Sequence, residues 1–577
     1  MAVVDVTSRI EMQFVAGTWT ALATRDVLGD IVMKRGIPGS GPTDVVAGRG
    51  ELTFDLDNST KNAGGVLGWY SPAHASKRSG WTYGVAIRWI LYYEAAASVT
   101  SITRSGVTAT VTQTAHGFAT GDYVLIAGAV ETDYNGVFSI AVTGVDEYTY
   151  VVANAPSTPA TGTITATHVY VRFRGKVAAI LPEPGSSLSR RVSVTCYDAM
   201  DDLLTADLTD VTVQTAQTES QLLATLVAAL PTAAQPPAMS FATGIDTFAY
   251  CFDKLGDGIK AASAAKDVVL STLGALYVRG DGTLVYRTRR DRAAMASSFT
   301  LTNTMVELVV PSSLDNVFNR VATTCHPKTV DAAATTVLWA QTGAAPSIPA
   351  GATVTIIGTY RDPNDTQTLI GGLAQVTPIV ATTDYTGNDA ADGGGTDRTG
   401  SVSVVTTAYA TRVEFAVTNG FTGPIYLTKL QLRGKGVYDI GPRTFEAATT
   451  IAAYDRPVEI DMPYQEDVAI AQSVGLFVNA QYQALAQQAD AVGFVAGRST
   501  TFMAAAMALE PTAVVTVTES VTGLAAVPLT VQGIELHYAH KRSLRARLLT
   551  APAAPYQMWA LGTAGFSELG STTILGF

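Results

Sequence analysis

The chain has 577 residues, of which 47% are apolar and 15% are charged, and its formal net charge is −11. This length suffices for about four domains, and so high an apolar content excludes a disordered chain. The mean hydropathy is +0.21, yet no apolar run is long enough to span a bilayer, and the first residues do not resemble a signal peptide. We therefore expect a soluble protein that does not insert into membranes.

The excess of acidic over basic residues also indicates how the protein interacts with DNA. A protein that grips duplex DNA needs lysine and arginine to neutralise phosphates, and this chain has 38 such residues against 49 acidic ones. The balance therefore argues against tight DNA binding and suits a wall past which DNA slides.

Strand patterns dominate the chain. Short runs of valine, threonine, isoleucine and tyrosine alternate with glycine, proline, asparagine and aspartate, which is typical of a series of small β-domains. Clear examples lie at 51–58, 85–93, 168–177, 191–198 and 282–289. Asp281-Gly282 separates two such runs and predicts a tight hairpin, because glycine tolerates the positive φ of primed turns.

Three segments have helical periodicity. The first, 219–230, stops at Pro231, and the second, 263–273, precedes Gly274 as a plausible C-cap. The third runs from about 466 to 486 and carries two carboxylates in its first turn, where the helix dipole favours anions.

The segment from about 98 to 167 looks inserted. It has no lysine, and Arg104 is its only basic residue. The flanking strands, 85–93 and 168–177, are predicted to be neighbours in one sheet whose connecting loop has expanded, since loops tolerate long insertions. A second loop-rich zone, 383–400, lies within a long β-region from about 330 to 435.

No catalytic motif is present: the sequence has no phosphate-binding loop, no dinucleotide fingerprint, no HExxH and no GxSxG elbow. His537 and His540 are three residues apart, which places them on opposite faces of a strand, and the adjacency of Cys325 and His326 does not by itself pair thiol with imidazole. We expect no enzymatic activity and no cofactor. The three cysteines are far apart and are expected to be buried free thiols: Cys196, Cys251 and Cys325.

Two charged groups are candidate sites. Four carboxylates in the glycine-rich loop are candidates for a hard cation such as Ca²⁺, although aspartate and glycine also serve turn geometry in a solvated loop: Asp384, Asp389, Asp392 and Asp397. In 540–550, Arg545 and Arg547 share one face of a predicted strand. That face is either solvated or contacts an acidic neighbour or an adjacent subunit.

The order of several motifs is more specific than any one of them. The first are Trp19 and Thr20, Arg35 and Gly36, and a strand ending in Leu56, Asp57 and Asn58. Others follow at 70–74, 84–89, 173–204, 272–289, 313–321, 433–447, 456–474, 531–553 and 558–577. In this order they resemble the tail-tip proteins of long-tailed, siphophage-like bacteriophages over most of the chain.

The inserted segment is similar to the small FCCH-like β-domain of phage tail proteins, in which a sugar or host-surface contact is often suspected. The cues are TAHGFATGDYVLIAGA, YNGVFSI and YTYVV. This copy has no cysteine, so no thiol chemistry is carried over. Phe118, Tyr123 and Tyr134 are candidates for stacking on carbohydrate, with plain core positions as the alternative.

The resemblance implies a structural baseplate hub at the tail tip of a virion, assembled in the host cytoplasm. Such a hub is a homotrimer whose chains each supply two tube-like β-barrels, so that the ring adapts the hexameric distal tail ring to a trimeric tip. It also implies contacts with the tape-measure protein and with other tail-tip or fibre proteins, while DNA passes without specific binding. In that setting Arg545 and Arg547 are candidates for subunit or tape-measure contacts.

The implied fold is mainly β with a few helices, in several domains. The expected divisions are a split N-terminal barrel (1–97 with 168–210), the inserted module (98–167), an α+β domain (211–325), a β-sandwich-like domain (326–440), and a helix with a C-terminal barrel (441–577). One alternative is a peripheral adhesin that binds host carbohydrate through the inserted module and the 330–435 region. A second alternative is a hub that also hydrolyses peptidoglycan.

Overall fold

The computed structural model describes residues 4–183, 190–209, 211–256, 258–310, 317–451, 453–483, 488–539 and 543–553, together with two short strands, β42 (Gln557–Trp559) and β43 (Thr573–Leu575). The rest of the closing motif, 558–577, therefore lies outside the described residues, as do His540 and part of the 313–321 motif. The fold is mainly β with a few helices and several hydrophobic cores, which confirms the expected fold class.

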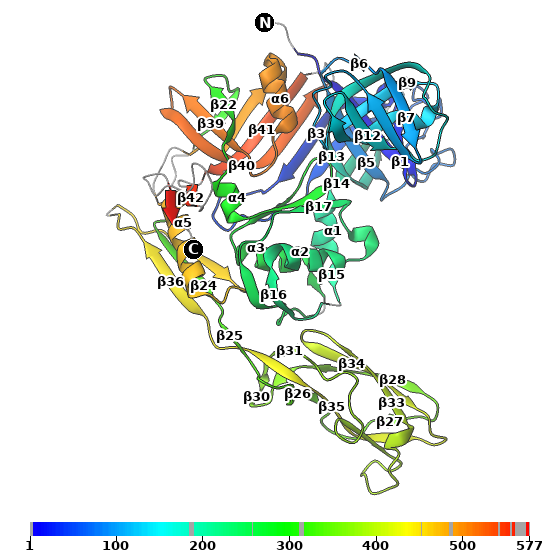
Figure 1. Cartoon of the computed structure of the whole chain (residues 1–577), viewed down its shortest axis with the longest axis vertical. Helices are drawn as coiled ribbons and strands as arrows, with labels where there is room; N and C mark the ends of the chain where they lie inside the picture. The colour runs from blue at the N-terminus through cyan, green and yellow to red at the C-terminus, as the bar shows by residue number, and fades with distance from the viewer. Residues whose placement is uncertain are drawn as a thin grey trace.

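Strands from the two ends of the chain form one sheet, in the upper part of Figure 1. In spatial order its strands are β2 (Thr18–Ala21), β1 (Thr7–Val15), β5 (Ala86–Tyr92), β13 (Gly162–Glu183), β14 (Arg191–Tyr197), β4 (Glu51–Asp57), β3 (Val27–Gly36), β40 (Leu524–Ala539), β41 (Ser543–Pro552), β38 (Ala491–Val495) and β23 (Glu307–Val309). The halves meet where β3 pairs with β40, antiparallel, from Ile31 opposite Tyr538 to Gly36 opposite Gly533. We call this the shared sheet.

One hydrophobic core lies against the shared sheet. Met33, Trp89 and Leu536, from both ends of the chain, are fully buried in it. The alternation of apolar and polar residues directs one set of side chains into this core and leaves the other set on the opposite face. α6 (Thr500–Ala508) and the ladder of β22 (Ser297–Thr302) with β39 (Val514–Glu519) complete the C-terminal side.

The two tube-like barrels stay a prediction. Among the described strands no ladder closes either half into a barrel, and both halves belong to one sheet whose ends include β2, β22 and β23. The halves are joined because β40 pairs with β3 as well as with β41.

The inserted segment folds as a β-module with its own core. Its four-stranded sheet has the order β11 (Ala141–Gly144), β12 (Glu147–Val151), β8 (Thr108–Thr112), β7 (Ser101–Ser105), while β9 (Tyr123–Ala129) pairs with β10 (Gly136–Ser139) and with β13. β6 (Ala97–Ser98) also joins β13. The strand β13 is 22 residues long and pairs first with β9 and then with β5, so it continues without a break from module to body. The pairing of β5 with β13 confirms the predicted neighbours.

Below the shared sheet lies a region of helices and short strands (Figure 1). Its helices are α1 (Ala199–Thr205), α2 (Glu219–Ala228), α3 (Ala261–Leu270) and α4 (Arg289–Ala293). Its strands are β17 (Ala238–Phe241), β20 (Ala275–Val278) and β21 (Thr283–Arg287) in one sheet, with the pairs β15 (Asp207–Leu208) with β19 (Ile259–Lys260) and β16 (Gln214–Thr218) with β18 (Thr247–Cys251). The β20–β21 hairpin, with Gly282 at φ +89°, confirms the predicted turn.

All three predicted helices form: α2, α3 and α5 (Val468–Tyr482). α2 begins with a capping box between Thr218 and Gln221. α5 packs on β24 (Arg320–Cys325) and β36 (Arg443–Ala448), whose sheet also contains β37 (Pro457–Met462), and its buried face shares one core with α2 and α3. The 441–577 segment is therefore divided, because its helix belongs to the α+β core and its last strands to the shared sheet.

The segment from about 326 to 440 projects from the body at the bottom of Figure 1. Its long strand β35 (Ile425–Asp439) pairs with β25 (Lys328–Val330), β26 (Thr336–Ala340), β27 (Ser347–Ile348), β31 (Gly371–Leu373) and β32 (Tyr385–Asn388). The other strands are β28 (Thr353–Thr359), β34 (Arg412–Asn419) and β33 (Val402–Ala408), and the pair β29 (Arg361–Asp362) with β30 (Asp365–Leu369). A separate core holds this domain together. Among the described helices, none has the length and apolar character needed to cross a membrane.

Candidate functional site

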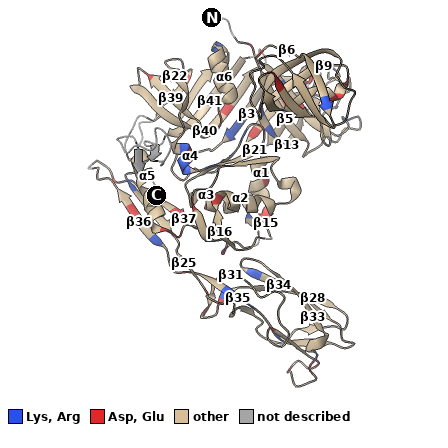
Figure 2. Ribbon diagram, in the orientation of Figure 1, with Lys and Arg blue, Asp and Glu red and all other residues tan. Residues whose placement is uncertain are grey.

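A row of charged residues crosses the face of the shared sheet that points away from the core. In register on β4, β3, β40 and β41 lie Glu51, Lys34, Glu535 and Arg547, and the row ends across β38 at Glu307 of β23. The charges alternate in sign along this row, which we call the charge ladder. Figure 2 shows charged residues of both signs on neighbouring strands of this sheet.

The charge ladder is held by ion pairs between its members. Lys34 Nζ lies 3.8 Å from Glu535 Oε1, Arg547 Nη1 lies 3.3 Å from Glu535 Oε2, and Arg547 Nε lies 2.8 Å from Glu307 Oε1. The hydrogen bond to Glu307 raises the pKa of Arg547 above its usual value. Each such exposed pair contributes about 0.2–1 kcal/mol to stability. The main effect of the ladder is therefore to balance the charges on this face, and its effect on the stability of the fold is small.

A glycine makes the last contact of the charge ladder possible. Gly493 of β38 lies between Arg547 and Glu307 in the register. A Cβ at Gly493 would lie 2.9 Å from the Glu307 Cβ, closer than carbon atoms pack. Gly493 therefore leaves the space across which Glu307 reaches Arg547.

The predicted placement of Arg545 and Arg547 on one face of a strand is confirmed, and we call this pair the arginine stripe. Arg545 and Arg547 point to the polar side of β41, and the alternate residues Leu544, Ala546 and Leu548 are buried. Arg545 is exposed opposite His537 of β40, whose Nε2 lies 2.8 Å from Asp30 Oδ2. Arg547 is paired within the chain, and a contact of either arginine with another subunit stays a prediction.

The sequence analysis missed the partners of Arg547. Glu535 lies 12 residues away and Glu307 240 residues away. No local pattern signals such pairs, because they follow from strand register between distant segments.

For the four candidate carboxylates the structure favours the alternative of local structural contacts over a calcium site. Asp384 is fully buried and accepts hydrogen bonds from Arg433, with Nε 2.6 Å from Oδ1 and Nη2 3.0 Å from Oδ2. Its pKa is lowered because these bonds and a main-chain N–H outweigh the effect of burial.

The other three carboxylates are occupied locally. Asp389 pairs with Arg398 and accepts the Thr396 N–H, and Asp392 and Asp397 accept main-chain N–H groups two residues ahead. Within the described ranges no three acidic, histidine or cysteine side chains gather as a metal site.

The aromatic candidates of the inserted module are packed. Tyr134 is fully buried and its hydroxyl donates to the Ser157 carbonyl at 3.0 Å, so its interpretation as a surface contact is wrong. Phe118 is half-buried, with ring centroids of His116 and Tyr148 at 5.2 and 5.5 Å.

Tyr123 is also half-buried, against the small cluster that joins the module to the body, and burial raises its pKa. For all three aromatic candidates the structure favours the alternative of core positions.

Cys325 and His326 are adjacent in sequence but have different hydrogen-bond partners. Cys325 Sγ donates to the Arg443 carbonyl at 3.4 Å, whereas His326 Nε2 lies 2.7 Å from Asp461 Oδ1. All three cysteines are buried and free, as expected, and burial raises their thiol pKa values.

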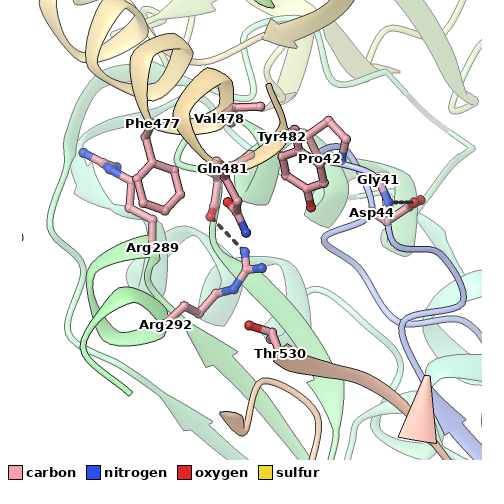
Figure 3. Close-up of a pocket in the computed structure, with 11 residues that line it drawn as sticks. Gly41, Pro42, Asp44, Arg289, Arg292, Phe477, Val478, Gln481, Tyr482 and Thr530 are labelled. Carbon is pink, nitrogen blue, oxygen red and sulfur yellow. Dashed lines mark hydrogen bonds between the residues drawn. The ribbon is translucent and has the colours of Figure 1, made fainter. Parts of the chain in front are cut away.

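A small cavity lies where α4, α5, β40 and the 37–47 loop meet (Figure 3). Arg292 points into it and donates to the Leu273 and Gly274 carbonyls at 3.3 and 3.0 Å. Tyr482 donates to the Ser40 carbonyl at 3.0 Å, and burial lowers the pKa of Arg292 and raises that of Tyr482. These polar groups bind main-chain oxygens, so they hold together the segments that meet at the cavity.

No protein-family model matches the chain, and no curated protein matches its sequence. Three solved structures are similar along its length: the tail protein from Neisseria meningitidis MC58 (9% identity, 95% of this chain and 96% of that one, TM-score 0.42), the prophage MuSo2 tail protein from Shewanella oneidensis (9%, 95% and 99%, 0.42), and the prophage tail protein gp18 from Listeria monocytogenes EGD-e (7%, 94% and 94%, 0.36). All three are described as tail proteins, and two of them come from prophages. With TM-scores below 0.5 they do not establish a common fold, so a function has to be inferred from the chain's own residues.

Proposed function

We propose that this protein is the structural hub at the tip of a phage tail, where three copies form a ring between the distal tail ring and the tip. The ring lines the channel through which the tape-measure protein and DNA pass. The observation that carries the proposal is the shared sheet, which joins both ends of the chain, leaves open edges and turns a charge-alternating face away from its hydrophobic core. The motif order from Trp19 to the arginine stripe agrees with it.

The open edges favour a ring of copies. At β2 and β23 the described ladders stop, which leaves main-chain N–H and C=O groups that another strand can pair. Cyclic assembly of identical chains covers such edges and limits the number of copies. Because each chain brings a strand-dense half from either end, three copies present six such halves to a hexameric partner.

The charge ladder suits a channel wall. Its alternating, mutually paired charges give little net field along the row, whereas a wall of unpaired lysine and arginine would retain DNA through its phosphates. Exposed polar side chains also keep this face wet, so an apolar segment gains little by adhering to it.

We also propose that the protein acts without catalysis. The carboxylates that the sequence singled out are bound by arginine and main-chain N–H groups, and the thiols are buried. A zymogram on host cell walls tests this directly. No clearing is expected, and clearing by the purified chain would favour the peptidoglycan hydrolase instead.

Light scattering tests the assembly. Purified protein co-expressed with the distal tail protein is expected to run as a complex that contains three copies of this chain. A mass that corresponds to one copy under those conditions would refute the hub.

The adhesin is the second candidate, and the projecting 326–440 domain favours it. The outer side of its β28–β34–β33 sheet exposes Ile357 and Val405, at 60% and 64% exposure. Deletion of residues 331–436 separates the two functions. If the protein is only a hub, tails without this domain assemble and still adsorb to the host; if it is an adhesin, they assemble but no longer adsorb.

A further inference from the structure

A groove of about 470 Å³ lies between α6 and the β20–β21 hairpin. One wall is formed by small residues of α6, namely Thr501, Ala504 and Ala508, and the other by Val285 and Phe299. This volume falls in the range of about 300–1,000 Å³ that is typical of ligand sites, and the lining is mostly apolar. We call it the α6 groove.

The α6 groove carries an excess of positive charge. Arg279 and Arg287 line it, and Arg279 is neutralised by Asp281 at 2.6 Å. Arg287 interacts with the hydroxyl of Tyr277, which also lines the groove, but it makes no ion pair with a carboxylate in the described part of the chain. Its Nε is buried without a hydrogen-bond partner.

Glu510 also lines the groove, and its carboxylate accepts hydrogen bonds from two guanidinium groups. Glu510 accepts from Arg172 Nη1 at 2.9 Å and from Arg35 Nη2 at 2.8 Å, and these arginine side chains are 3% and 1% exposed. This region of an otherwise acidic chain therefore holds four arginines and two carboxylates. Of these arginines, Arg287 is the one that has no carboxylate partner among the described residues, so it can pair with an anion of a ligand.

One residue of the groove lining has a strained backbone. Thr512 is buried and has φ +74°, a conformation that β-branched residues rarely adopt. Such strain persists only where the surroundings fix it, and it gathers at binding sites. The groove end is therefore held in shape without a ligand.

We propose that the α6 groove binds an apolar segment of another protein that carries an aspartate or glutamate, with the carboxylate paired to Arg287 and the apolar side chains against α6. The charge favours an anion, and the apolar walls favour a peptide over a free anion, because they reward buried hydrocarbon. The small side chains of α6 let a partner backbone approach closely, as in a helix laid in a groove.

A displayed random-peptide library tests this on the purified full chain. The enriched peptides are expected to combine one carboxylate with two or more large apolar residues. Binding of such a peptide, followed by fluorescence anisotropy, is expected to weaken at least tenfold in Arg287→Glu and in Ala508→Trp, which reverses the charge and fills the groove.

The matched control is Arg290→Glu, which makes the same charge change at an exposed position outside the groove. It is expected to bind as the wild type does, and thermal melts of all variants show whether each is folded. The proposal is overturned if the enriched peptides lack a carboxylate, or if Arg290→Glu loses as much peptide affinity as Arg287→Glu. It is also overturned if the same peptides are enriched on Ala508→Trp, or if their consensus matches a segment of this chain. Binding of a single-stranded oligonucleotide that is lost in Arg287→Glu, without any enriched peptide, would replace it with a nucleic-acid site.

Discussion

Replacing Glu510 by glutamine tests whether the two ends of the chain are locked together by charge. The carboxylate of Glu510 follows α6, whereas Arg35 lies on β3 and Arg172 on β13, so this triad joins the C-terminal half to the N-terminal half. Both guanidinium groups are almost fully buried, and burial lowers the pKa of Arg172 to about 10 even with Glu510 present.

The expected loss of unfolding free energy depends on the hydrogen bonds that the two arginines retain without the Glu510 carboxylate. Removing one partner of a buried ion pair costs about 3–5 kcal/mol, because a buried charge is left uncompensated. Arg172 retains the Met507 and Leu509 carbonyls at 2.6 and 2.8 Å, and Arg35 only a long contact to the Val278 carbonyl at 3.4 Å. We therefore expect the lower end, about 3 kcal/mol, for Glu510→Gln.

Urea unfolding followed by tryptophan fluorescence measures this loss, because Trp81 and Trp89 are buried in the core of the shared sheet. The matched control is Glu307→Gln, which removes an exposed partner of Arg547 and is expected to cost less than about 1 kcal/mol. Replacing all three residues of the triad by methionine is expected to recover most of the stability. Equal effects of Glu510→Gln and Glu307→Gln would refute the reasoning.

Three further predictions concern a buried acid, the charge ladder and the glycine-rich loop. Burial raises the pKa of Asp198 to about 6, so the folded state binds this proton more tightly than the unfolded chain. As pH falls from about 6 to 4, the free energy of unfolding of the wild type is expected to rise by up to about 3 kcal/mol relative to Asp198→Asn. Unfolding free energies of the two proteins that change in parallel with pH would contradict this. Gly493→Val is expected to displace Glu307 and cost about 1–3 kcal/mol, with faster hydrogen exchange in β23; unchanged exchange there would show that the space at Gly493 is not needed. Calcium and EDTA are expected to give the same melting temperature, because Asp384 is already bound to Arg433, and a rise of several degrees with calcium would show that the loop does bind the ion.

Features of the fold that depend on neighbours in sequence were predictable. The turn at Gly282 needs only a positive φ between two alternating runs, and α2 needs only its apolar spacing, its capping box and Pro231. The face of Arg545 and Arg547 followed from alternation alone.

Features that depend on long-range register were not predictable. The charge ladder pairs Lys34 with Glu535 across 501 residues, and no periodicity within either strand specifies that register. The joining of both ends of the chain in one sheet was not predictable for the same reason, since it follows from the pairing of β40 with β3. The partner of Asp384 was not predictable for a different reason: a carboxylate that accepts from an arginine 49 residues away looks the same in sequence as one that is free to bind a cation.

A reconstruction of the intact tail, with a label on this chain, measures the central claim most directly. Three copies around the tail axis are expected, with the row from Glu51 to Glu307 facing the lumen and β2 and β23 covered by neighbouring copies. A single copy away from the axis, or three copies whose charge ladder faces outward, would contradict the account.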